Sequence, residues 1–363
     1  MSIETPAAQA GPFAHEPVSI SRTMGLVMLA LLPATVFGLW QFGWPAIYLF
    51  AATIASALVF EAMSLRVAGK PVRPFLLDGS ALLTGWLLAM TLPPWAPWWI
   101  GVVGSFMAIV IAKQVFGGIG QNLFNPAMVA RVALLIAFPL EMTSFVVPTP
   151  LFSAEAPGLL QGLAITFGGQ GFDAFSGATV LGHVRTELGQ GHELSVILPG
   201  LFGPLSGALG TVAGSLGETS ALLLLLGGLL LLYKRIITWH IPLAMLATVA
   251  ILATLLHLYD PERYAGALYH LVSGATLLGA FFIATDLVTS PVSARGQILF
   301  GVGCGLLVYV IRTWTSYPEG VAFAVMLMNA CTPLIDHYVK PRIYGRDRKG
   351  SPIEYADDAG VSR

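Results

Sequence analysis

The chain has 363 residues, of which 56% are hydrophobic and only 10% are charged, and its formal net charge is −1. A soluble domain usually carries about a quarter charged residues, so this composition cannot cover a globular surface in water. It excludes an ordinary soluble enzyme, and the nearly neutral charge does not indicate a nucleic-acid partner. We therefore expect a protein whose surface is solvated mainly by lipid.

Apolar runs long enough to cross a bilayer recur along the chain. A span needs about 20 mostly apolar residues, and by that rule we expect an all-α polytopic fold with roughly ten transmembrane helices. The expected spans are 23–41, 44–63, 77–93, 98–116, 123–140, 217–233, 239–258, 266–286, 297–313 and 319–337.

Basic residues that flank these runs indicate the orientation, because cytoplasmic loops carry an excess of Lys and Arg. Most of them, including Lys113 and the basic tail after Lys340, fall on one side of the membrane in this count. Arg185, Arg263 and Arg312 are left on the other side. We therefore expect a multi-pass protein of the bacterial inner membrane with both termini in the cytoplasm.

This orientation divides the chain into five regions. They are a cytoplasmic segment 1–22, a first membrane region 23–140, a periplasmic insertion 141–216, a second membrane region 217–338 and a cytoplasmic tail 339–363. Within the insertion, 196–214 is apolar but rich in Gly and Pro, so we expect it to be re-entrant or to lie at the membrane surface. Long insertions of this kind are usually functional or disordered.

The two membrane regions resemble each other weakly. The sequence GSALLTG at 79–85 parallels SGATLLG at 273–279, and NLFNPAM at 122–128 parallels NACTPLI at 329–335. With about five spans in each half, an odd number, the halves must lie inverted across the membrane, and such repeats commonly meet around a central site. Alternatively, small residues recur simply because they let membrane helices approach closely.

The insertion contains the motif D-x-x-S-G-A-T, which runs from Asp173 to Thr179. A lone Thr in such a loop is usually a turn residue. Here, however, Gly177 and Ala178 leave backbone amides uncovered for a phosphate. The hydroxyl of Thr179 is expected to be exposed, with the carboxylate of Asp173 nearby and Ser176 in the same turn.

A second S-G-A-T ends at Thr276 and serves as an internal comparison. It has His270 in place of the acid and lies in an expected span. We therefore assign Thr276 a role in helix packing or in lining a ligand site. Similarly, Glu218 is expected in the first turn of a capped helix, and tryptophans such as Trp239 and Trp314 fit an interfacial aromatic belt rather than cofactor contacts.

Taken together, these motifs resemble the D subunit of Rnf ion-translocating oxidoreductases (RnfD), which is related to the B subunit of the sodium-pumping NADH:quinone reductase. The stretches that carry the resemblance are 117–128, 176–179, 214–221, 279–286 and 289–291. The resemblance implies a fold of two inverted five-helix repeats similar to urea and ammonium transporters. It also implies FMN joined to Thr179 through a phosphoester, and a second, non-covalent flavin (riboflavin) within the membrane.

Polar residues at the ends of two expected spans provide a place for that second flavin. Asn122 and Asn125 enter a span beside Pro126, which is expected to kink the helix, and Asp286 ends another span. Polar side chains in lipid normally face the protein interior. By resemblance, Asn122, Asn125 and Asp286 are candidates to contact the riboflavin. The alternatives are helix–helix hydrogen bonds for the asparagines and interfacial solvation for Asp286.

We therefore expect a membrane flavoprotein subunit of a ferredoxin:NAD+ oxidoreductase of the Rnf type. It would pass electrons between the two flavins, coupled to movement of Na⁺ or H⁺, without being catalytic alone and without a metal site of its own. The resemblance implies as partners a periplasmic flavin-bearing subunit, membrane iron–sulfur subunits and a flavin transferase. The rivals are a passive channel or small-solute transporter of the same fold, and an anchor without a cofactor.

Overall fold

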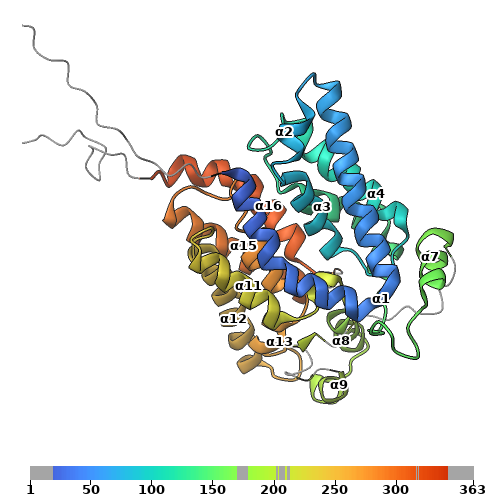
Figure 1. The fold of residues 1–363 in the computed structure, drawn as a ribbon. Helices are drawn as coiled ribbons and strands as arrows, with labels where there is room; N and C mark the ends of the chain where they lie inside the picture. The colour runs from blue at the N-terminus through green and yellow to red at the C-terminus, as the bar shows by residue number, and fades with distance from the viewer. Residues whose placement is uncertain are drawn as a thin grey trace, which may run out of the picture.

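A computed structural model describes residues 19–169, 179–201, 203, 209–210, 213–315, 317 and 319–341. These residues form helices joined mostly by short connections (Figure 1). Among the described residues, four helical segments are long and apolar enough to cross a membrane: Ile20–Val67, Val72–Thr91, His240–Tyr259 and Ala294–Trp314. The expected all-helical membrane protein is confirmed, whereas the number of spans and the inverted repeats stay predictions.

The first helix, α1 (Ile20–Val67), consists of two helical halves joined at a sharp bend, which Figure 1 shows in blue. The bend is at Gly43, whose φ of 73° and ψ of −159° are not helical. A residue without a Cβ adopts such angles at little steric cost. The two halves correspond to the expected spans 23–41 and 44–63.

The remainder of the first membrane region consists of α2 (Val72–Leu76), α3 (Ser80–Thr91), α4 (Trp98–Phe106), the π-helix η1 (Met107–Gln114) and α5 (Pro126–Ala137). Most of these elements pack against α1, and α5 packs against α3, α4 and η1. The packing of α4 on α1 is close, because a Cβ placed on Gly101 would collide with the side chain of Thr53. Small residues permit such close approach between membrane helices.

The insertion is partly helical. Its described helices are α6 (Pro139–Thr143), α7 (Leu159–Gly168), α8 (Val180–Gly189) and α9 (Leu194–Leu201). The amide of Leu194 donates to the Glu262 carbonyl at 3.0 Å, so α9 begins against the loop that follows α12. Of the expected surface-lying stretch 196–214, the first part is helical in α9, and most of the remainder is outside the described residues.

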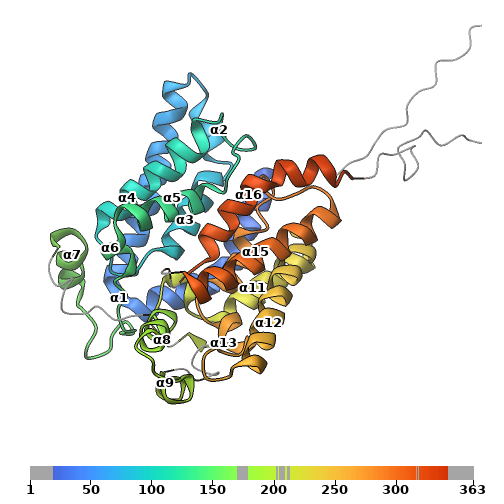
Figure 2. The same ribbon diagram turned by 180° about the vertical axis from the view of Figure 1, so that it is seen from behind.

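The second membrane region is seen from behind in Figure 2. Its elements are η3 (Leu216–Glu218), α11 (Ala221–Tyr233), α12 (His240–Tyr259), α13 (Ala267–Val272), α14 (Thr276–Leu278), the π-helix η4 (Gly279–Ile283), α15 (Ala294–Trp314) and α16 (Val321–Tyr338). The expected span 266–286 is therefore broken into α13, α14 and η4. Interrupted helices inside membrane proteins occur where they are buried in protein or line a cavity.

One expectation about helix geometry was wrong. Pro126 does not kink a helix, because α5 begins at this residue and Asn125 is its N-cap. Proline is well tolerated at the first helical position, where its missing N–H has no intrahelical partner to lose. The segment 117–125 before it forms a loop, in which Gly117, Gly118 and Gly120 all have positive φ.

Candidate functional site

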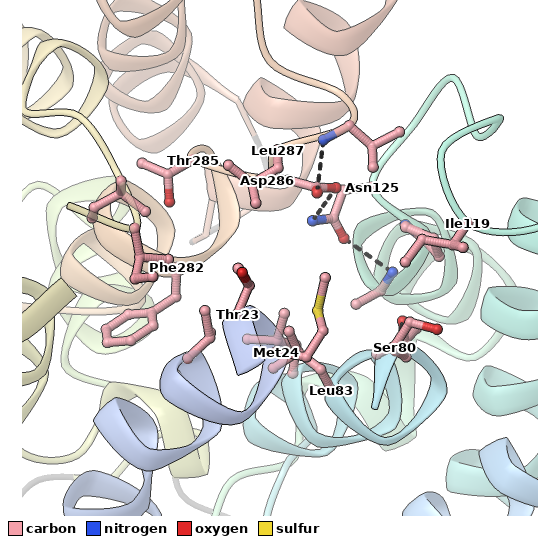
Figure 3. A pocket seen from close by; sticks show the side chains of 18 of the residues that line it. Thr23, Met24, Ser80, Leu83, Ile119, Asn125, Phe282, Thr285, Asp286 and Leu287 are labelled. Carbon is pink, nitrogen blue, oxygen red and sulfur yellow. Dashed lines mark hydrogen bonds between the residues drawn. The ribbon is translucent and has the colours of Figure 1, made fainter. Parts of the chain in front are cut away.

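A pocket lies where the beginning of α1, α3, the start of α5 and the segment after η4 meet (Figure 3). Asn122, Asn125 and Asp286, which were the candidates from the sequence, all line it. Asn125 and Asp286 are 161 positions apart in the chain, yet they face each other across one edge of this pocket. The structure therefore brings the three residues together, and we call this site the amide–carboxylate pocket.

Each polar residue of the pocket also has a structural role. Asn125 Oδ1 accepts hydrogen bonds from the amides of Ala127 and Met128, which caps α5, and its Nδ2 donates to Asp286 Oδ2 over 3.4 Å. Asp286 also accepts from the Val288 amide and from the Thr289 hydroxyl. Asp286 is thus half-buried and held by hydrogen bonds within the protein.

A lysine that the sequence analysis placed among the cytoplasmic flanking charges lines the same pocket. Lys113 Nζ lies 2.8 Å from Glu61 Oε1 and 2.8 Å from the Ser80 hydroxyl, and its side chain is 3% exposed. Its charge is therefore neutralised within the protein by Glu61, and the orientation for which the sequence analysis counted Lys113 stays a prediction. The available signal was a lysine inside an apolar run, because ionisable residues in membrane segments normally pair with one another.

The remaining walls are apolar, and they are close together. Met24, Leu83, Ile119 and Phe282 surround the space in Figure 3, and the cavity volume is about 90 Å³. Small-molecule pockets usually measure about 300–1,000 Å³. The amide, hydroxyl, ammonium and carboxylate groups suit the donors and acceptors along the edge of a flavin ring. A whole ring would fit only if flexible side chains such as Met24 moved aside.

Thr179 is the N-cap of α8, and its hydroxyl accepts a hydrogen bond from the Gly182 amide at 3.1 Å. It is only 4% exposed, so the expected exposure of the hydroxyl was wrong for the unmodified chain. Its neighbours there include Glu218 and Ser273, with which it lines a small cavity. The rest of the motif, namely Asp173, Ser176, Gly177 and Ala178, lies outside the described residues.

The position of Thr179 nevertheless suits a phosphate. The N-terminal end of a helix carries unpaired amides and a partial positive charge, and both favour a bound phosphate group. The other S-G-A-T also ends at the start of a helix, α14, but its threonine is fully buried. Thr276 is 0% exposed and its hydroxyl donates to the His270 carbonyl at 2.9 Å, which is the helix-packing role expected for it.

A buried charged cluster lies beside the second S-G-A-T. Arg312 Nη2 is 3.0 Å from Glu319 Oε1, and the same oxygen accepts from the Ala275 amide at 3.2 Å. Arg312, which the sequence analysis left on the outer side of the membrane, has a side chain that is only 1% exposed. The backbone of Gly274, with φ of 67°, lies against this ion pair, so a Cβ added to Gly274 would collide with Glu319 Oε1.

Glu218 belongs to the same region. It lies in η3, before α11, and accepts from the Ser215 hydroxyl at 2.8 Å, whereas Ser220 caps α11. Its expected place in the first turn of that helix was therefore wrong. Glu218 lines one small cavity with Thr179 and another with Arg131 and Glu319. Sequence reasoning overlooked Arg131 and Glu319, although ionisable residues within apolar runs indicate functional sites by default.

The amide–carboxylate pocket and Thr179 lie toward opposite ends of the first half of α1. Thr23 lines the pocket, whereas Gly38 packs against Leu216 and Thr219, next to Glu218. At about 1.5 Å per residue, Thr23 and Gly38 are separated by about 22 Å along the helix. The two candidate sites thus lie toward opposite ends of this helical segment.

Comparison with known proteins places the chain in a family. The model of the NQR2, RnfD, RnfE family matches residues 7–345. A protein of Halorhodospira halophila, named as the D subunit of an ion-translocating oxidoreductase complex, is 56% identical over 345 residues, which cover 95% of this chain and 97% of that protein. The protein of the same name from Stutzerimonas stutzeri is 60% identical over 92% of this chain and 95% of its own length. The one from Escherichia coli is 44% identical over 93% and 98%.

Proposed function

The chain belongs to the NQR2, RnfD, RnfE family, and from this premise we propose that it is the flavin-carrying membrane subunit of an ion-translocating oxidoreductase complex. Its relatives are named as components of such complexes, so this chain is a subunit of a redox-linked translocase that requires other subunits. Two flavins belong to the proposal: FMN esterified to Thr179, and a non-covalent flavin in the amide–carboxylate pocket. Bound flavins would supply the one- and two-electron chemistry.

The observation that carries the first part is the placement of Thr179 at the N-terminus of α8. To form the ester, Thr179 Oγ1 loses its proton and attacks the phosphorus of an activated flavin phosphate anhydride, which a separate transferase would supply. The new bond from Oγ1 to phosphorus replaces the bond from phosphorus to the anhydride oxygen, and the other phosphate group leaves with the proton. The N-terminus of α8 then stabilises the negative phosphate. Because the hydroxyl is 4% exposed, the transferase must reach it before this region packs, or after it opens locally.

The second part is supported by the meeting of Asn122, Asn125 and Asp286 in one pocket. Capping of α5 fixes the orientation of Asn125, and three donors fix Asp286. Such preorganised groups hold a ring edge in one orientation without rearranging. Lys113, whose charge is balanced by Glu61, adds a further polar group to the wall.

The chief rival remains a passive channel or small-solute transporter of the same fold. It explains the apolar helices and the buried polar groups, but it has no use for D-x-x-S-G-A-T in the insertion. An anchor that carries no cofactor would have no use for the amide–carboxylate pocket either. The movement of Na⁺ or H⁺, and its coupling to electron transfer, belong to the proposal for the whole complex.

A denaturing gel tests the proposal. Protein from cells that carry the transferase should give a band that fluoresces under ultraviolet light in wild type but not in Thr179→Ala. Thr276→Ala, which changes the other S-G-A-T, is the matched control and should still fluoresce. A dark wild-type band from such cells would favour the channel or the anchor. For the second flavin, acid extraction of the purified protein should release riboflavin.

A further inference from the structure

The helix α7 in the insertion lies beside the bend of α1 (Figure 1). It packs on α1 through Gly162, Ile165 and Thr166, which are buried. The contact is close, because a Cβ placed on Gly162 would collide with the Cβ of Trp44. The Thr166 hydroxyl also donates to the carbonyl of Pro45 at 3.4 Å. One side of α7 is therefore fixed against the bend.

A second side of α7 is apolar and has nothing packed over it. Leu159, Leu160, Leu163 and Phe167 are 48%, 78%, 36% and 49% exposed. At about 100° of rotation per residue, these four side chains share an arc of about 100°. Gln161 lies outside this arc and is also exposed. We call the four residues the apolar face of α7.

Another exposed aromatic side chain belongs to the same region. Phe152 is 86% exposed, and its φ of 71° is left-handed, which is unusual for a bulky residue. Such a backbone costs about 1–2 kcal/mol. The preceding residue is held at the bend of α1, because the Leu151 amide donates to the Trp40 carbonyl at 2.7 Å. A costly conformation thus presents an aromatic ring outside the protein.

The position of the bend indicates what surrounds these residues. It joins the expected spans 23–41 and 44–63, and a bend between two spans lies near a membrane surface. Aromatic rings gather there: Phe167 contacts Trp98 with centroids 6.1 Å apart and Tyr48 at 6.5 Å. Trp and Tyr are enriched where a membrane meets water.

The chemistry of the apolar face favours lipid as its partner. Its Leu and Phe side chains have no hydrogen-bonding groups, and α7 contains no charged residue with which to orient a protein partner. The face is also continuous with a membrane helix, since α7 packs on the second half of α1, where Val59 and Met63 are 54% and 53% exposed. Large exposed apolar patches mark interaction sites, and acyl chains need only an apolar surface.

We propose that the apolar face of α7 and Phe152 form a lipid collar, which inserts into the boundary between headgroups and acyl chains beside the bend of α1. Helices that lie at this boundary bury their apolar side by about 5–10 Å. Gln161 would then face the headgroups or water. The proposal is independent of flavin attachment. It also means that part of the insertion lies in the membrane surface, shortly before the D-x-x-S-G-A-T motif begins at Asp173.

Quenching by spin-labelled lipid tests the collar. The full chain is placed in phosphatidylcholine nanodiscs with a bimane fluorophore on Leu163→Cys, in a Cys331→Ser background because Cys331 is exposed. The matched control is Gln161→Cys, which is exposed on the same helix but about 160° away around its axis. Phosphatidylcholine with a nitroxide near the headgroup should quench the label at 163 several-fold more than the label at 161. Iodide in the water should show the reverse order.

Equal quenching by lipid at the two positions would overturn the proposal. The measurement is repeated on the assembled complex, where a label at 163 that neither lipid nor iodide reaches would show that a partner protein covers the face, which also overturns it. Should Leu163→Cys fail to fold, Leu160→Cys takes its place, because Leu160 is 78% exposed. Phe152→Cys should behave like Leu163→Cys, and a label there that only iodide reaches would overturn its place in the collar.

Discussion

Asn125 and Asp286 join the two membrane regions at one edge of the amide–carboxylate pocket, through a hydrogen bond of 3.4 Å from Asn125 Nδ2 to Asp286 Oδ2. Asn125 is fixed by capping α5, and Asp286 by the Val288 amide and the Thr289 hydroxyl. The orientation of each side chain is therefore fixed by hydrogen bonds that do not involve the other. A ligand that binds in the pocket beside them meets groups already in place.

Replacement of Asp286 is expected to release the non-covalent flavin. A hydrogen bond to a charged group contributes about 1.5–3 kcal/mol, so Asp286→Ala should weaken binding roughly 10- to 100-fold. Riboflavin released by acid from the purified protein is the measurement. Asp336→Ala is the control, because Asp336 accepts from the Val292 amide and does not line the pocket. Equal riboflavin content in wild type and Asp286→Ala would show that the carboxylate does not contribute to riboflavin binding.

A substitution at Asn125 separates its two roles. Asn125→Asp keeps an oxygen that can cap α5, but it places a second carboxylate next to Asp286. We expect the melting temperature in detergent to change little, since Asn and Asp are similar N-caps, while riboflavin content falls. Asn125→Ala should lower both, because the cap is lost as well, at about 1 kcal/mol. If riboflavin stays bound in both variants, Asn125 has only the capping role.

The Lys113–Glu61 pair is expected to be critical for stability. Removal of one partner of a buried pair leaves an uncompensated charge and typically costs about 3–5 kcal/mol. Lys113→Met and Glu61→Gln should therefore each lower the melting temperature strongly. The double variant should be more stable than Lys113→Met alone, because no lone carboxylate remains. Two single effects that simply add would mean that Lys113 and Glu61 do not interact.

Gly274 and Gly69 form a natural pair for testing the charged cluster. Both have nearly the same left-handed backbone, with φ of 67° and 66°, but a Cβ on Gly69 meets nothing within 4 Å, whereas one on Gly274 would collide with Glu319 and press on Arg312. Gly69→Ala should lower the free energy of unfolding only by the cost of placing an alanine in a left-handed backbone conformation, about 1–2 kcal/mol. Gly274→Ala should cost clearly more in thermal unfolding. Equal losses of stability in the two variants would show that Glu319 and Arg312 can move aside at little energetic cost.

Much of the helical arrangement was predictable from apolar periodicity and length, since the expected spans 239–258 and 297–313 coincide closely with α12 and α15. The points at which helices begin or are interrupted were harder to predict. A hydropathy run does not show that a helix starts at Pro126, or that Gly274 interrupts 266–286, because those features depend on capping and on positive φ.

The candidate site was predictable in part. Polar residues at the ends of apolar runs led to Asn122, Asn125 and Asp286, which meet in space. Lys113 and Arg312 were counted as flanking charges, because their partners Glu61 and Glu319 become neighbours only in the folded chain. The burial of Thr179 also depends on tertiary contacts, with Glu218 and with the end of α13, which local sequence does not encode.

The central claim, that Thr179 carries a flavin through a phosphoester, is tested most directly by mass spectrometry of the protein isolated from its native membrane. The account predicts that the peptide containing Thr179 carries the added mass of an FMN ester on that residue, and that the peptide containing Thr276 is unmodified. A peptide found with an unmodified Thr179 throughout would contradict the account.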